Sequence, residues 1–125
     1  MKGAFALPFM LALAAPALAS AYAAFSTPGR AAYCGITEGP APLSLICWTP
    51  SDGLTLNMLA TGRAQARYYR PNKGYYDDFA PVLAFGHSWE AKLMFTCRST
   101  ATGLTCTNQQ GHGWWLGRSK GYRIF

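Results

Sequence analysis

Two histidines are the side chains of this 125-residue chain best suited to proton transfer, because an imidazole titrates close to neutral pH. His87 precedes Ser88, and Glu90 lies nearby, so these residues have the types of a catalytic triad. The glycine spacing of a nucleophile elbow is missing around Ser88. We expect His112, between two glycines, to be exposed in a loop as a general base, a weak ligand, a donor to a partner or an ordinary turn residue. A small hydrolase using His112 or His87 with a nearby carboxylate is therefore one hypothesis.

The spacing of the possible ligands does not favour a metal-binding site. Asp77 and Asp78 are adjacent, and adjacent side chains of an extended chain point to opposite sides. No second group of oxygen ligands lies near them, as a calcium site would need. The four cysteines include no Cys-x-x-Cys pair and the histidines are isolated, unlike a zinc site. The sequence therefore predicts no metal ion and no cofactor.

A basic and aromatic run over residues 63–73 is suited to binding rather than to catalysis. It holds four Lys and Arg residues interleaved with Tyr68 and Tyr69. Cations and flat rings together can follow a sugar-phosphate or glycan-phosphate chain. The same residues would also suit an edge strand, where charged side chains oppose aggregation. The edge strand is the favoured interpretation.

Trp114 and Trp115 are consecutive, so on a strand their side chains face opposite sides of the sheet. One ring can enter the core. The other would then stack on a sugar ring or anchor a protein partner at the surface, or it would be buried with the first under residues 122–125. The sequence leaves these alternatives open. The candidate binding residues are Trp114, Trp115, His112, Arg118, Arg67 and Tyr69.

The first 19 residues have the pattern of a signal peptide. Lys2 gives a positive start, an apolar run covers residues 4–15, and small residues precede a cut after Ala19, with a cut after residue 23 as the alternative. The apolar run is about half of the roughly 20 residues that cross a bilayer, so no stable membrane anchor is expected. We expect an exported protein, periplasmic or extracellular, with a single domain over residues 25–125.

The charge balance indicates a class of partner. Removal of residues 1–19 takes away one of eleven Lys and Arg residues, so ten cations remain against five acids, a formal charge of +5. A basic exported domain tends to meet an anionic envelope polymer or an acidic protein, although the charge can also serve solubility alone. Export makes nucleic acid an unexpected partner.

The four cysteines predict two disulfides, since an even number is typical of oxidising compartments. Each pair of consecutive cysteines is centred on a possible two-residue turn, at residues 40–41 and 101–102. Two hairpins with a cross-strand bridge in each satisfy both symmetries. The predicted pairs are Cys34–Cys47 and Cys97–Cys106.

The alternation of apolar and polar residues predicts an all-β domain. Residues 95–118 have the pattern of a three-stranded meander, and a turn at residues 109–110 would place Cys106 opposite Gly113, leaving room for the disulfide. Further strands are expected at residues 30–36, 43–48, 54–59, 63–73 and 82–85, with a run from Trp89 into the meander. Residues 25–30 and 74–79 are expected to be a turn and a loop. The prediction is a small antiparallel sandwich or open barrel of seven to nine strands, without a repeat beyond the two disulfide hairpins.

Several segments of the chain resemble a family of small secreted bacterial proteins that is catalogued as a domain of unknown function. Members of that family end in a similar Gly-His-Gly, aromatic, Leu, Arg and terminal Phe pattern. They often carry a further cysteine pair, with one Cys near an Asp in the segment that corresponds to residues 74–79, where this chain has Tyr and Asp. The resemblance implies export and a compact fold but no activity. The matching segments are residues 25–34, 83–89, 95–99, 103–108 and 111–118.

The leading functional hypothesis is a non-enzymatic binding or interaction module of the cell envelope. It depends on the basic charge, the tryptophan pair and the basic aromatic run. A secreted enzyme inhibitor is a further alternative, since small disulfide-bonded β-domains can present a rigid loop, here residues 111–113.

Overall fold

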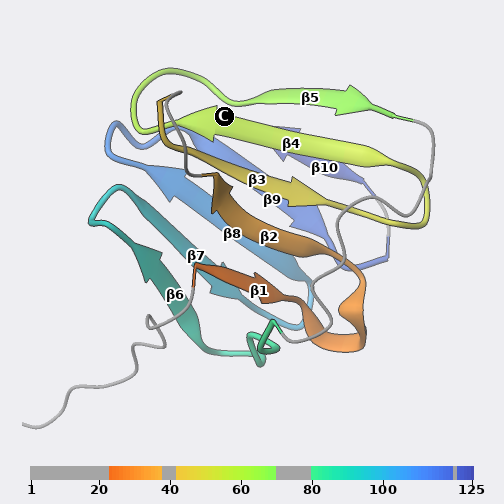
Figure 1. Cartoon of the computed structure of the whole chain (residues 1–125). Coiled ribbons are helices and arrows are strands. Elements are labelled where there is room, and N and C mark those ends of the chain that lie inside the picture. Colours follow the sequence, from red (N-terminus) through yellow and green to blue (C-terminus); the bar gives the residue numbers. More distant parts are fainter. Residues whose placement is uncertain (1–22, 38–41, 70–79, 120) are drawn as a thin grey trace, which may run out of the picture.

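Two five-stranded antiparallel sheets pack face to face in the computed structural model, which describes residues 23–37, 42–69, 80–119 and 121–125 (Figure 1). The all-β prediction is confirmed, and of its two alternatives, sandwich and open barrel, the structure is the sandwich. The first sheet has the order β1 (Ala24–Ser26), β2 (Tyr33–Thr37), β3 (Ser44–Trp48), β4 (Leu54–Leu59) and β5 (Gln65–Tyr68). The second has the order β10 (Tyr122–Ile124), β9 (Gly113–Gly117), β8 (Gly103–Asn108), β7 (Phe95–Ser99) and β6 (Ser88–Ala91).

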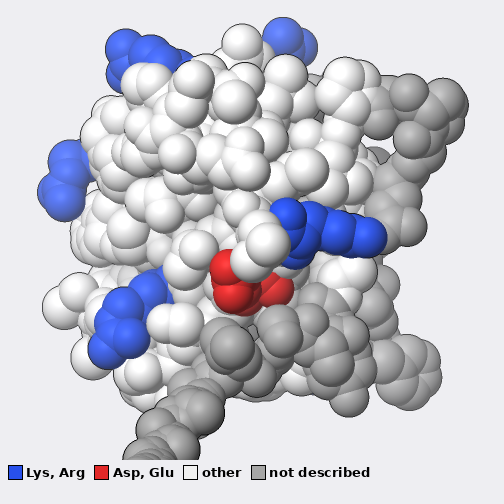
Figure 2. Space-filling model, turned by 90° about the vertical axis from the view of Figure 1, so that its left-hand side faces the viewer, with Lys and Arg blue, Asp and Glu red and all other residues white. Residues whose placement is uncertain are grey.

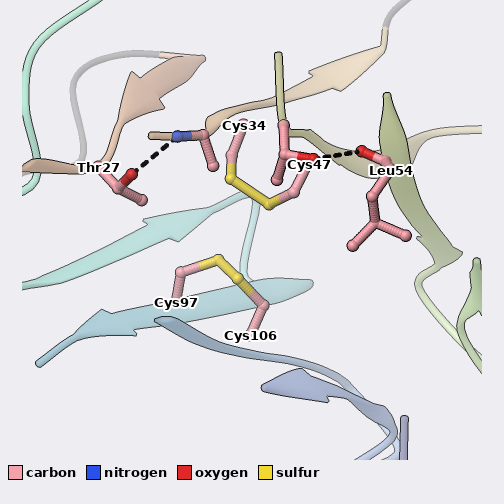
Figure 3. The surroundings of a disulfide bond; sticks show 8 residues. Thr27, Cys34, Cys47, Leu54, Cys97 and Cys106 are labelled. Atoms are coloured by element: carbon pink, nitrogen blue, oxygen red, sulfur yellow. Dashed lines mark hydrogen bonds between the residues drawn. A yellow bond between two sulfur atoms is a disulfide. The ribbon is translucent and has the colours of Figure 1, made fainter. Parts of the chain in front are cut away.

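Both predicted disulfides are present, and each joins neighbouring strands of one sheet. Cys34 pairs with Cys47 between β2 and β3, and Cys97 pairs with Cys106 between β7 and β8. The Cα atoms of each pair are 4.0 Å apart, as expected for directly opposed residues that exchange no backbone hydrogen bonds. Figure 3 shows the two bridges facing each other across the core.

The two halves of the chain form an internal structural repeat that the sequence analysis missed. Each half is a five-stranded meander with its disulfide between the second and third strands. The inward-facing rows through the disulfides also correspond, and the first members of the two rows contact each other with ring centroids 4.8 Å apart. The rows are Phe25, Cys34, Cys47, Leu56 and Ala66 in the first sheet, and Trp89, Cys97, Cys106, Trp114 and Ile124 in the second.

Ten strands are present in the described part of the chain, more than the seven to nine expected. One additional strand is β1, in a segment predicted to be a turn, and a 3-10 turn (Pro28–Arg30) then delays the start of β2 to Tyr33. Another arises because the run from Trp89 is broken into β6 and β7. Lys92 and Leu93 form that turn with φ of 55° and 56°, a conformation for which glycine is the usual signal.

Residues 82–85 are not a strand, contrary to the prediction. Val82 makes only an isolated parallel bridge to Ser26, while Leu83 donates its backbone N–H to the Ser26 carbonyl. Leu83 is buried, but Val82 and Phe85 are 47% and 40% exposed. Leu83 in the core and the backbone hydrogen bonds of Ser26 with Pro81 and Leu83 hold this segment against β1.

The β8–β9 register differs by one residue from the predicted one. Cys106 lies opposite Trp114, and Gly113 lies opposite Thr107. The backbone N–H of Asn108 donates to the His112 carbonyl, and this hydrogen bond fixes the register. The loop between the two strands therefore has three residues and ends at Gly111, whose φ is 79°. Gly113 is required for a different reason from the one expected, because an added Cβ would overlap the carbonyl oxygen of Cys106.

Candidate functional site

The two adjacent tryptophans have different environments. Trp114 points into the core and is fully buried, and its indole N–H has no hydrogen-bond partner in the described structure. Trp115 points to the outer face of the second sheet and is partly exposed. The expectation of opposite faces is confirmed, and Trp114 is a core residue.

The indole of Trp115 lies over Gly103 of the neighbouring strand β8. A Cβ at Gly103 would be 2.7 Å from the Trp115 Nε1 atom and 3.0 Å from Cε2, so only glycine leaves room for the ring in this position. Arg123 of β10 places its guanidinium carbon 4.7 Å from the ring centroid, in a cation–π contact. The ring of Trp115 is thus positioned by its contact with Gly103 and by the guanidinium of Arg123 over it.

A row of outward-facing residues crosses the second sheet through Trp115. The strand register sets Arg98, Thr105, Trp115 and Arg123 next to one another on β7, β8, β9 and β10. Arg98 also donates to the Ser88 hydroxyl at 3.4 Å. We name these four residues together with Gly103 the Trp115 face. It combines one aromatic ring with two exposed guanidinium groups on an open sheet.

Arg67 and Tyr69 lie away from this face, on the other sheet. Both are exposed, at and just beyond β5, which is an edge strand as predicted. Arg67 shares the outer face of the first sheet with Tyr33 and Trp48, whose ring centroids are 6.5 Å apart. The remainder of the predicted run, residues 70–73, is outside the described residues, as are Asp77 and Asp78.

The two histidines lie at opposite ends of the second sheet. His87 precedes β6, where its carbonyl accepts the Ser99 N–H at the end of β7, whereas His112 adjoins Asn108, which pairs with the start of β7. A five-residue strand separates these ends by about 15 Å. No hydrogen bond or ion pair joins either imidazole to another described residue. This arrangement gives the hydrolase hypothesis no support.

The loop proposed for an enzyme inhibitor is held against the domain. His112 is partly buried, and its backbone N–H donates to the Asn108 side chain at 3.1 Å. Gly113 is buried beside the Cys106 carbonyl. The loop therefore does not present His112 as a projecting anchor.

Arg118 is exposed at the end of β9, with its guanidinium carbon 4.8 Å from the ring centroid of Phe85. It lies beyond the row that contains Trp115. The structure therefore divides the predicted binding residues among the core, two sheet faces and the sheet ends. Only Trp115 belongs to the Trp115 face.

Basic side chains form separate groups on the side of the molecule seen in Figure 2, with uncharged surface between them and an acidic group beside one of them. The described residues contain no cluster of three or more His, Cys, Asp or Glu side chains able to hold a metal ion. No helix in the described ranges is long and apolar enough to cross a membrane.

Comparison with known proteins gave no match to a protein-family model, a curated protein or a solved structure.

Sequence reasoning missed Arg98 and Arg123 as candidate binding residues. Both side chains lie on the same face of the second sheet as Trp115. Predicting this would require knowing the register of four strands. The available signal was the Phe-Thr-Cys-Arg pattern at residues 95–98, since a buried cysteine places the following arginine outward.

Proposed function

We propose that this chain is an exported, non-enzymatic binding module whose Trp115 face binds an anionic polysaccharide of the cell envelope. The contact that supports the proposal best is the guanidinium of Arg123 over the ring of the outward-facing Trp115. An indole face suits the C–H surface of a sugar ring, and a guanidinium suits a carboxylate or phosphate carried by that sugar.

A polymer fits this face better than a single sugar. Arg98 and Arg123 are three strands apart, which corresponds to about 14 Å at the usual strand spacing. One sugar ring cannot reach both guanidinium groups, whereas a chain lying across the strands can contact both cations with Trp115 between them. The formal charge of +5 that remains after removal of residues 1–19 favours the approach of a polyanion.

Export is part of the proposal. Two buried disulfides are typical of proteins from oxidising compartments. The signal-peptide pattern of residues 1–19 gives the route. We also propose membership of the family of small secreted bacterial proteins of unknown function, on the strength of the C-terminal pattern at residues 111–118.

The experiment measures binding of the purified oxidised protein to polygalacturonate, with neutral dextran as the comparison polymer, at low and high salt. Trp115→Ala is compared with Trp48→Ala, because both tryptophans lie partly exposed on the outer face of a sheet. Arg123→Gln is compared with Arg63→Gln, an exposed cation outside the Trp115 face. Each variant is first shown to be folded by its thermal transition.

The proposal expects wild-type protein to bind polygalacturonate but not dextran, and Trp115→Ala to weaken binding at least tenfold, about 1.4 kcal/mol. Arg123→Gln should weaken binding and reduce its salt dependence, while Trp48→Ala and Arg63→Gln stay within about twofold of wild type. Equal effects of the two tryptophan variants, or no binding at low salt, would contradict the proposal.

A further inference from the structure

A cleft opens at one end of the sandwich, between the two sheets. Its cavity volume is about 640 Å³, within the range of about 300–1,000 Å³ typical of small-molecule sites. The walls come from the segment between β1 and β2, the β3–β4 turn, the segment before β6, the β7–β8 turn and the β9–β10 turn. Gly103 belongs both to the lining of the cleft and to the Trp115 face, but the cleft opens between the sheets, whereas the side chains of Trp115, Arg98 and Arg123 lie on the outer face of the second sheet.

The inner wall of the cleft is apolar. Leu54, Leu104 and Leu116 line it, and all three belong to the hydrophobic core. They come from β4 of the first sheet and from β8 and β9 of the second. An aliphatic chain that enters the cleft would therefore contact side chains from both sheets, exchanging water contact for apolar contact.

Two guanidinium groups belong to the lining of the cleft. Arg118 stacks on Phe85, which also lines the cleft and is 40% exposed, so an aromatic face holds the cation at the opening. Arg30 comes from the 3-10 turn between β1 and β2. Its left-handed backbone, with φ of 53°, is fixed by a 2.7 Å hydrogen bond from its N–H to the Thr27 carbonyl.

Asp52 is the carboxylate among the described lining residues, and it already has partners. Its Oδ1 accepts hydrogen bonds from the Thr49 hydroxyl and the Leu54 backbone N–H. Arg118 at the opening supplies a cation for an anionic head group. A carboxylate also matches the two parallel donors of a guanidinium.

We propose that this cleft binds a small amphiphilic monoanion, an acyl chain that ends in a carboxylate. The chain packs on Leu54, Leu104 and Leu116, and the carboxylate pairs with Arg118 at the opening. This site is independent of polysaccharide binding at the Trp115 face, and the two can be lost separately.

The test titrates the oxidised protein with decanoate below its micelle concentration. Decanol and decyltrimethylammonium supply the same chain with a neutral and a cationic head, and acetate supplies the carboxylate without the chain. Affinity is measured by calorimetry, and the site is located by amide NMR shifts of Gly117 and Gly121, which line the cleft and lie outside the Trp115 face.

Two variants probe the two halves of the ligand. Arg118→Gln removes the cation, with Arg98→Gln as the matched loss of charge on the outer sheet face. Ala31→Trp fills the cleft from an exposed lining position, where the added ring requires no change in the core. Thermal transitions confirm that each variant is folded.

We expect decanoate to bind at least fivefold more tightly than decanol, and decyltrimethylammonium and acetate to bind more weakly than either. Arg118→Gln should remove the preference for decanoate over decanol, Arg98→Gln should leave it unchanged, and Ala31→Trp should abolish binding of both. Three results would overturn the proposal. They are decanoate-induced NMR shifts at residues outside the cleft and not at its glycines, equal effects of Arg118→Gln and Arg98→Gln on the preference for decanoate, and wild-type affinity for decanoate in folded Ala31→Trp. Polygalacturonate binding should be the same in wild type and Ala31→Trp, so failure of this proposal is distinguishable from failure of the proposed function.

Discussion

The side-chain nitrogen of Asn108 donates a 2.8 Å hydrogen bond to the carbonyl oxygen of Gly62, 46 residues earlier in the sequence. The same nitrogen donates to the Leu59 carbonyl at 3.0 Å. The side-chain oxygen accepts the backbone N–H groups of Gln110 and His112. A buried amide therefore uses both of its polar atoms to join the β4–β5 connection of one sheet to the β8–β9 loop of the other.

Asn108→Ala should lower the free energy of unfolding by about 2–4 kcal/mol, because it leaves buried carbonyl and N–H groups without partners. Asn108→Asp keeps the acceptor but replaces the donor, so at neutral pH we expect it to be at least as damaging. Urea unfolding measures both. Asn57→Ala, on the outer face of β4, is the control and should cost under about 1 kcal/mol. Similar costs at the two positions would show that the Asn108 side chain does not join the loops.

The two disulfides should contribute nearly equally to stability. They close loops of similar length, with sequence separations of 13 and 9, and each lies in the core of its own sheet. The chain-entropy relation assigns about 3 kcal/mol to each. We expect the double variants Cys34→Ala with Cys47→Ala, and Cys97→Ala with Cys106→Ala, to lower the unfolding free energy by amounts within about 1 kcal/mol of each other. A much larger loss for one pair would mean that the two halves are not equivalent in stability.

Gly111 of the β8–β9 loop and Gly113 at the start of β9 should respond differently to alanine. Gly111 has open space around it, so Gly111→Ala carries only the cost of the left-handed backbone, about 1 kcal/mol. Gly113→Ala forces a methyl group into the Cys106 carbonyl and should cost more than about 3 kcal/mol or prevent folding. Thermal unfolding of the two variants compares them. A Gly113→Ala protein as stable as Gly111→Ala would contradict the close approach of β8 and β9.

Trp114 should tolerate phenylalanine better than its burial suggests. Its N–H is buried without a hydrogen-bond partner in the described structure, an unfavourable arrangement that Trp114→Phe removes. The relief offsets part of the lost packing, so we expect a cost below about 2 kcal/mol, against about 3–5 kcal/mol for Trp114→Ala. Chemical denaturation measures the difference. A cost well above about 2 kcal/mol for Trp114→Phe would contradict a buried indole N–H without a partner.

Features that depend on residues close in sequence were predictable. The disulfide pairs follow from cysteines placed symmetrically about short turns, and the bounds of β4 agree with the alternation of residues 54–59. Where a turn lacks its usual glycine signal, as at Lys92 and Leu93, the prediction failed because the conformation is imposed by the strands on either side.

The sequence by itself determined that Trp114 and Trp115 face opposite sides of a strand, since side chains alternate along any strand. It did not determine which of them is inside. That choice depends on which face of β9 the other sheet covers, and only the packing of the two sheets decides it. The contact of Arg123 with Trp115, the hydrogen bond of Asn108 to Gly62 and the cleft between the sheets were likewise decided only by the tertiary structure. Each of these joins segments whose proximity follows from sheet packing or strand order and not from local pattern.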